Sequence, residues 1–118
     1  MRWILGIHAL GGNTTASENT AVGTQAMLAN STGTANVAVG FGALDANTTA
    51  SYNTAIGHNA LTASSGQQNA AFGSSALAGN TTGTHGVAVG RHALGSTTTG
   101  IHNTAVGYAA LYTNVQGN

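Results

Sequence analysis

Apolar residues recur along this chain with a fixed period. A glycine follows a short run of apolar residues, as in Val37-Ala38-Val39-Gly40, and alanine and then leucine or methionine follow at the third and fourth positions after it. The unit occurs seven times, anchored on Gly6, Gly23, Gly40, Gly57, Gly73, Gly90 and Gly107. Successive anchor numbers differ by 17, except for a difference of 16 between the fourth and fifth anchors. Self-similarity at a fixed period predicts a stacked repeat architecture, here a single repeat domain over residues 1–118.

Each unit places a short strand directly before its anchor glycine. Thr20 and Val22 share one face of such a strand and Ala21 the other, because side chains alternate along it. Glycine, threonine and asparagine are poor helix formers, and the apolar spacing does not fit a helix. A second extended segment is expected at the Asn-Thr-Thr corner, as at 47–49. The pattern predicts an all-β fold, a parallel β-solenoid (β-roll or β-helix) of about seven 17-residue coils, roughly 30 Å long at about 4.8 Å per coil.

The strands are apolar on both faces, with valine or isoleucine on one side and alanine on the other. A coil this short has room inside for one of these faces, so the other would form an apolar ribbon along the rod. Exposed ribbons of this kind mark contact surfaces. Self-association is therefore the favoured prediction, and a parallel homotrimer would bury the ribbon around one axis. The alternative is a monomer in which alanine lines a narrow bend.

Composition removes several classes of function. Arg2, Glu18, Asp45 and Arg91 are the charged residues, 3% of the chain, against about 25% in soluble domains. The chain therefore lacks the basic stripe that nucleic-acid binding requires. It also lacks the run of about 20 apolar residues that a membrane span requires, and it contains no cysteine. The first seven residues follow the repeat, so we expect a first coil there and no signal peptide in this segment. No nucleic acid, membrane insertion or cofactor is predicted.

The units Asn-Thr-Ala-Val-Gly-x-x-Ala-Leu, followed by Asn-Thr-Thr-Gly, resemble the repeat tracts of phage tail fibres and of proteins that end in an endosialidase-type intramolecular chaperone. The segment at 36–40, Asn-Val-Ala-Val-Gly, is similar to the Asn-Ser-Val-Ala-Ile-Gly head repeat of trimeric autotransporter adhesins, although the period here is longer than the adhesin unit. The resemblance covers residues 2–118. It implies a trimeric fibre segment or adhesive head on an extracellular surface or a virion, with a host-surface glycan or a protein receptor as its ligand.

Residues that vary between copies are the candidates for ligand binding, because the fold explains the residues that recur. They occupy two slots, directly after each anchor glycine and directly before each strand, and carry nearly all aromatic, charged and imidazole groups. Aromatic faces beside amides suit sugars. The predicted glycan-facing edge consists of Phe41, Tyr52, His58, His85, Arg91, His92, His102 and Tyr108. The alternative is a passive rod in which these are neutral loop positions.

Catalysis and metal binding find less support in the sequence. The two carboxylates, Glu18 and Asp45, are separated by more than one full repeat, so a glycosidase-type pair within one chain is not expected. His85 and His102 occupy the same column in adjacent coils, about 5 Å apart, but no third ligand accompanies them. We therefore predict neither an enzyme nor a metal site.

Ice binding is a second class of function that the repeat allows. Thr-x-Thr or its serine variant recurs at the corner of the coil, and stacking would turn it into columns of hydroxyl and methyl groups. The candidate ice-binding face consists of Thr15, Thr32, Thr34, Thr49, Thr82 and Thr84. A third possibility is a self-assembling filament subunit, because the two open ends of the solenoid lack polar caps.

Overall fold

The structure is a computed structural model that describes Met1 and residues 3–118; Arg2 lies outside the described residues. The described residues contain no helix. Seven strands of three residues form one parallel sheet in chain order. The strands are β1 (Trp3–Leu5), β2 (Thr20–Val22), β3 (Val37–Val39), β4 (Thr54–Ile56), β5 (Ala70–Phe72), β6 (Val87–Val89) and β7 (Thr104–Val106).

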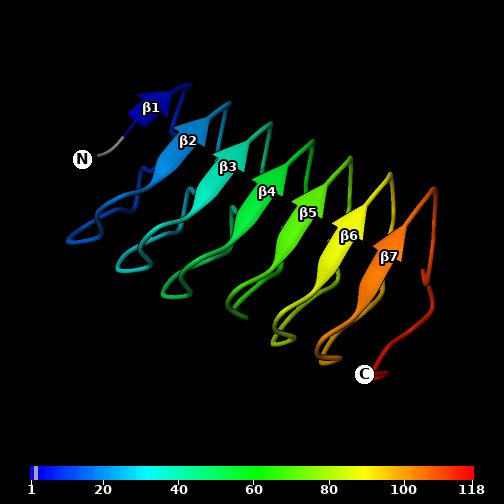
Figure 1. The fold of residues 1–118 in the computed structure, drawn as a ribbon. Helices are drawn as coiled ribbons and strands as arrows, with labels where there is room; N and C mark the ends of the chain where they lie inside the picture. Colours follow the sequence, from blue (N-terminus) through cyan, green and yellow to red (C-terminus); the bar gives the residue numbers. More distant parts are fainter. Residues whose placement is uncertain (2) are drawn as a thin grey trace.

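Successive coils lie directly above one another along a single axis (Figure 1). Ala21 pairs with Ala38 and Ala38 with Ala55, and Ala55 pairs with Ala71 across the shorter coil. The strands define a solenoid of about six turns that measures 34 × 20 × 16 Å. The prediction of an all-β parallel β-solenoid with a ~17-residue repeat is confirmed.

The anchor glycine ends each strand because no side chain fits at this position. Gly40 has a φ of 131°, a backbone conformation that residues with a Cβ rarely adopt. A Cβ added to it would lie 2.6 Å from the carbonyl oxygen of Gly57 in the next coil. The glycine column therefore lets neighbouring coils approach each other at the end of the strand.

Two consecutive turns follow each anchor, as the fifth coil illustrates. The N–H of Ala76 donates to the carbonyl of Gly73 (3.2 Å), and the N–H of Ala78 donates to the carbonyl of Ser75 (3.3 Å). Ser75 and Leu77 stand third in these turns with φ of 57° and 51°, which is the type II pattern. A left-handed residue costs about 1–2 kcal/mol, but burying leucine contributes about 1.5–3 kcal/mol. Burial of Leu77, 1% exposed, offsets the strain.

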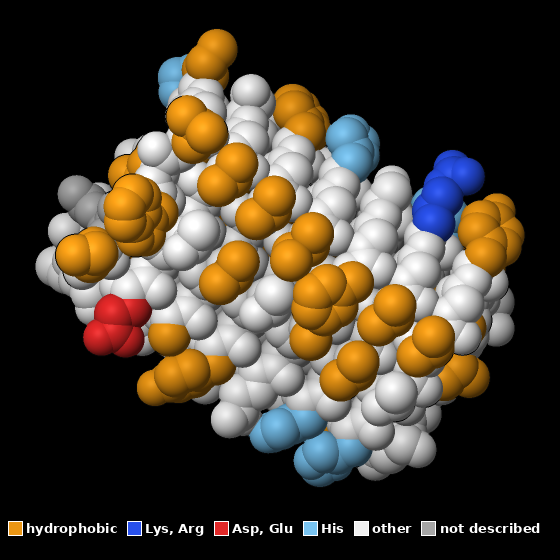
Figure 2. Space-filling model, turned by 45° about the horizontal axis from the view of Figure 1, so that its top comes forward, with side chains coloured by type: hydrophobic (Ala, Val, Ile, Leu, Met, Phe, Trp, Pro, Cys, Tyr) orange, Lys and Arg blue, Asp and Glu red, His pale blue; other side chains and the backbone are white. Residues whose placement is uncertain are grey.

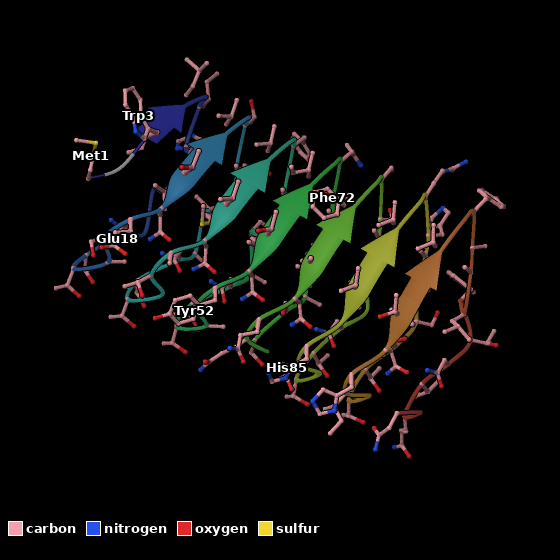
Figure 3. The ribbon with its side chains drawn as sticks, viewed as in Figure 1. Met1, Trp3, Glu18, Tyr52, Phe72 and His85 are labelled. Carbon is pink, nitrogen blue, oxygen red and sulfur yellow. The ribbon has the colours of Figure 1, made fainter. Side chains whose placement is uncertain are left out.

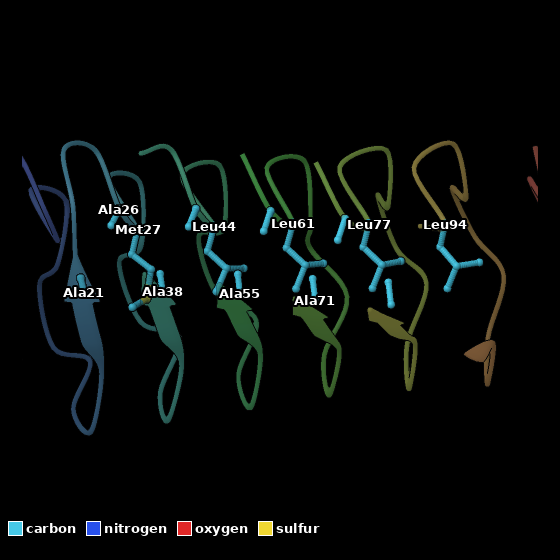
Figure 4. Packing of buried hydrophobic residues seen from close by; sticks show 14 of the residues in the cluster. Ala21, Ala26, Met27, Ala38, Leu44, Ala55, Leu61, Ala71, Leu77 and Leu94 are labelled. Atoms are coloured by element: carbon cyan, nitrogen blue, oxygen red, sulfur yellow. The ribbon is translucent and has the colours of Figure 1, made fainter. Parts of the chain in front are cut away.

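The core consists of three columns of side chains: the central alanines of β2–β7, the alanines three residues after the anchors, and the leucine or methionine that follows each of those (Figure 4). A central alanine such as Ala38 is fully buried and faces the column that contains Met27 and Leu44. In β1 the central residue is Ile4, which is 48% exposed. Alanine faces inward because the thin coil leaves little depth between the strand and the leucine column. The valine, isoleucine and phenylalanine side chains of the strands consequently face outward. The structure thus identifies which of the two apolar faces lies inside.

Two columns of asparagine are buried beside this core. In the first column, Oδ1 of Asn36 accepts from the N–H of Asn53, and Nδ2 of Asn36 donates to the carbonyl of Ala50, both at 2.9 Å. In the second column, Nδ2 of Asn47 donates to Oδ1 of Asn30 and to the carbonyl of Ala50, both at 3.0 Å. Buried backbone groups need such partners, and the amides supply them at the corner of the coil, where no strand does.

The Asn-Thr-Thr corner is a bend. Among the described residues, strand pairing is confined to β1–β7, so the expectation of a second extended segment is wrong. The N–H groups of Ser31 and Thr32 both donate to the carbonyl of Thr48, at 2.9 and 3.2 Å, and this convergence turns the chain. The residue missing from the shorter coil falls at the same corner, at 64–66, where a change of length is tolerated.

Candidate interaction surfaces

The outward side chains of the strands form an apolar surface along the whole rod, called the sheet face below. One of its columns consists of Leu5, Val22, Val39, Ile56, Phe72, Val89 and Val106, and the other of Trp3, Thr20, Val37, Thr54, Ala70, Val87 and Thr104. Ile56 and Phe72 each expose 39% of their surface although they lie in the middle of the sheet. Figure 2 shows the hydrophobic side chains as rows that follow the rod. A continuous apolar ribbon is therefore present on the valine side of the strands.

The eight residues predicted to face a glycan lie in two rows, one at each end of the strands. The row after the strands contains Phe41, His58, Arg91, His92 and Tyr108, and the row before the strands contains Tyr52, His85 and His102. Imidazoles lie on both sides of the sheet face in Figure 2, and Figure 3 shows Tyr52 and His85 on the side where the strands begin. A single chain therefore does not bring the eight residues together into one edge.

Within each row, side chains stack on their equivalents in the next coil. The rings of Phe41 and His58 are 5.4 Å apart with planes at 14°, and those of His85 and His102 are 4.9 Å apart with planes at 35°. Both distances are close to the spacing of the coils, which explains the pairs without a ligand. No three His, Asp or Glu side chains of the described residues come together as a set of metal ligands.

A shallow hollow of about 180 Å³ lies at the seventh coil and is lined by His92, Tyr108, Ala109 and Tyr112. The ring of His92 stands nearly perpendicular to both tyrosines, at 82° and 6.5 Å to Tyr108 and at 89° and 6.0 Å to Tyr112. Tyr112 is missing from the predicted set. Its position, the fifth after the anchor, also varies between copies, and that variation is the signal that could have identified it.

The predicted ice-binding threonines lie on the bend at the corner of the coil. Thr32 is exposed and Thr34 is half-buried, on either side of the buried Gly33. Thr15, Thr49 and Thr82 lie on the bend like Thr32, and Thr84 follows it like Thr34. The threonines next to them in the chain use their hydroxyl groups for hydrogen bonds between coils: Oγ1 of Thr81 donates to the carbonyl of Thr98 at 3.0 Å. This arrangement differs from a flat strand that presents two threonine columns to solvent.

The two acidic side chains lie at different corners of the coil. Glu18 is exposed in the row before the strands, whereas Asp45 lies in the turns that follow the third anchor. Oδ1 of Asp45 is buried without a hydrogen-bond partner. Burial raises the pKa of Asp45 above its ordinary value of 3.8, an effect that backbone hydrogen bonds from Ala46 and from Asp45 itself oppose. The two carboxyl groups do not form the close pair that acid–base hydrolysis uses.

Comparison with models of protein families, with curated proteins and with solved structures yields no match to this chain. The fold itself defines the class of protein, which is an all-β repeat protein built as a parallel β-solenoid. Over the part of the chain that the structure describes, no helix has the length and apolarity needed to cross a membrane.

Proposed function

We propose that this chain is a non-catalytic structural and adhesive fibre segment on an extracellular surface or a virion, of the kind found in phage tail fibres and trimeric bacterial adhesins. In this proposal, three parallel copies pack their sheet faces together around one axis. The apolar sheet face carries the proposal, because Ile56 and Phe72 stay 39% exposed in a single copy. Contiguous apolar surfaces of this kind usually meet a partner.

The sheet face is narrower than the rod. Strands of three residues span about 10 Å on a rod that is 34 Å long, so the face measures roughly 340 Å², against the roughly 600–1,000 Å² that each partner buries in a standard interface. A specific assembly would therefore also bury part of the rows that flank the strands.

The two columns of the sheet face balance each other in size at several levels of the rod. Phe72, the largest residue of its column between β2 and β7, stands beside Ala70, the smallest residue of the other column. Ile56 likewise stands beside the smaller Thr54. Water imposes no such balance, whereas close packing against a partner requires a nearly constant volume at each level. The balance supports burial of the sheet face in an assembly.

A parallel arrangement also requires an uncharged face. A rotation axis along the rod brings every side chain near its own copy, so charges on the face would meet like charges and repel. The described strands carry no Asp, Glu, Lys or Arg side chain. Glu18, Asp45 and Arg91 all lie outside the strands, which is compatible with parallel copies.

The adhesive part of the proposal rests on the two rows of variable residues beside the sheet face. Tyr52 exposes 62% of its surface and Tyr108 exposes 73%, so both offer aromatic faces to a ligand. Around a three-fold axis, the row after the strands in one copy would adjoin the row before the strands in the next. Residues that a single chain keeps apart would then line a common seam between copies.

Light scattering tests the assembly directly. We expect a mass three times the 11.5 kDa of one chain. Val39→Lys places a charge on the sheet face and should give monomers, because three like charges would meet at one level. Thr49→Lys adds the same charge at an exposed corner and should leave the trimer intact. A wild-type mass of 11.5 kDa would refute the assembly.

A glycan array tests adhesion separately. We expect the wild-type chain to bind a subset of glycans, with binding reduced by alanine at the exposed aromatic residues of the rows. A trimer that binds no glycan and no protein receptor would be a passive shaft, and the adhesive part of the proposal would then be wrong.

A further inference from the structure

We infer that the hollow lined by His92, Tyr108, Ala109 and Tyr112 is a binding site for one pyranose ring of a glycan. The inference rests on the proposed adhesive role and gives that role a defined site. Two of its members, His92 and Tyr108, belong to the row after the strands. The structure adds Tyr112 and the shallow hollow between the rings.

Three aromatic rings surround the hollow, and the imidazole meets both phenol rings edge to face. The planes of Tyr108 and Tyr112 stand at 82° and 89° to that of His92, with ring centroids 6.5 and 6.0 Å away. Ala109 follows Tyr108 in the chain and contributes only a methyl group. The volume of about 180 Å³ is well below the roughly 300–1,000 Å³ of sites for drug-sized ligands. A single sugar ring matches this size better than an extended ligand does.

Gly95 makes room for one wall of the hollow. Tyr112 lies one coil above Gly95, and a Cβ added there would be 2.7 Å from Cε2 and 2.9 Å from Cδ2 of the tyrosine. The ring of Tyr112 therefore rests against the backbone at Gly95. At the same position the other coils carry Gly11, Leu28, Asp45, Thr62 and Ala78, so most coils could not seat a tyrosine in this way.

The chemistry of the lining favours a sugar over a cation. A pyranose presents a face of C–H groups that stacks on aromatic rings, and its hydroxyls can bond to phenol oxygens and imidazole nitrogens. Aromatic hollows also bind quaternary ammonium groups, but no carboxylate lines this one. Arg91, the charged residue next to His92 in the chain, is positive, whereas Glu18 and Asp45 lie in earlier coils. An uncharged ring is therefore the better match.

Saturation-transfer NMR on the full chain tests the site with a panel of methyl pyranosides: glucoside, galactoside, mannoside and N-acetylglucosaminide. We expect saturable transfer to at least one of them and none to choline. Tyr112→Ala should weaken that binding about tenfold, the effect of losing one stacking partner. Thr49→Ala removes an exposed side chain at the corner of the coil, outside both rows of variable residues, and should leave the binding unchanged.

Gly95→Ala provides a second variant that keeps all three aromatic residues. Its methyl group should displace the ring of Tyr112 and weaken pyranoside binding at least threefold, while the circular dichroism spectrum stays that of the wild type. If Tyr112→Ala leaves wild-type sugar binding unchanged, the glycan binds elsewhere; the site is then wrong and the adhesive role stands. Binding of choline in place of pyranosides would also overturn the assignment. If the wild-type chain binds no sugar at all, the site is wrong, and the adhesive role then requires a protein receptor.

Discussion

The second asparagine column makes a prediction that can be worked out atom by atom. Thr97 takes the place in the sixth coil that asparagine holds in every other coil except the fourth, which has Ser64. Oγ1 of Thr97 and Oδ1 of Asn80 are both buried without a hydrogen-bond partner. In the third coil, Nδ2 of Asn47 donates to Oδ1 of Asn30 at 3.0 Å. We therefore expect Thr97→Asn to give Asn80 the donor that the neighbouring coil does not supply.

The magnitude follows from the cost of the two unpaired atoms. A buried polar group without a partner costs about 1–3 kcal/mol, and a new internal hydrogen bond contributes about 1 kcal/mol net. The backbone already has the right form, since the N–H of Thr97 donates to the carbonyl of Leu94 and that of Asn80 to Leu77, both at 3.1 Å. The longer asparagine side chain offsets part of this gain in stability. We expect the free energy of unfolding to rise by about 1–2 kcal/mol, which corresponds to a rise in Tm of about 4 °C per kcal/mol.

Thermal and urea unfolding, followed by circular dichroism at one fixed protein concentration, measures the effect. The concentration must be fixed because association also raises the apparent stability. Thr97→Val is the matched control: it removes the unpaired hydroxyl but adds no donor, and it should gain less than the asparagine variant. Thr97→Asp adds only acceptors and should destabilise the chain. An asparagine variant no more stable than the valine variant would refute the reasoning about the column.

Four further predictions use the same measurements or one freezing assay. Gly86 interrupts the first asparagine column, so Gly86→Asn should supply an acceptor for the N–H of Asn103, as in other coils, and raise the stability by about 1 kcal/mol. Gly40→Ala should lower it by about 3 kcal/mol, because its Cβ would lie 2.6 Å from the oxygen of Gly57; no loss would contradict the close approach of coils. Burial raises the pKa of Asp45 above 3.8, so the folded chain holds this proton more tightly than the unfolded chain and is destabilised as pH rises through the folded pKa. Asp45→Asn should therefore be more stable than the wild type at neutral pH, and this difference should vanish below 3.8. Millimolar protein should show no thermal hysteresis, because the threonine columns lie on a bend; a clear freezing gap would revive the ice-binding hypothesis.

The period of the sequence was enough to predict the fold, for a physical reason. Stacked coils must have equal length, so glycine at every 17th position from Gly6 to Gly57 directly reports the geometry. The sequence does not predict the backbone conformation of single residues in the same way. Leu77 and Gln68 have φ of 51° and 60°, a region that side chains of this kind rarely occupy. Burial and stacking impose these conformations, so residue-by-residue preferences could not reveal them.

Alternation in the strand defines two faces but does not say which of them lies inside. Only the depth of the coil decides which face lies inside, and this depth depends on the path of the turns that bring the leucine column opposite the alanine column. The positions of the candidate ligand-binding residues could not be predicted for the same reason. Their columns are evident from the repeat, but the separation of Tyr52 from His58 by a strand, and the meeting of His92 with Tyr112, depend on where the chain turns.

The orientation of the strands links the fold to the proposed assembly. With alanine inside, each coil contributes little apolar surface to its own core: the third coil buries Ala38, Ala43 and Leu44. Part of the stabilisation must therefore come from the buried amides and the hydrogen bonds between coils, which explains why asparagine recurs in both columns in most coils. The β-branched side chains that would normally fill a core remain outside on the sheet face. A solenoid of this design satisfies most of its buried polar groups internally and leaves its main apolar surface free for a partner, which is the physical basis for expecting association.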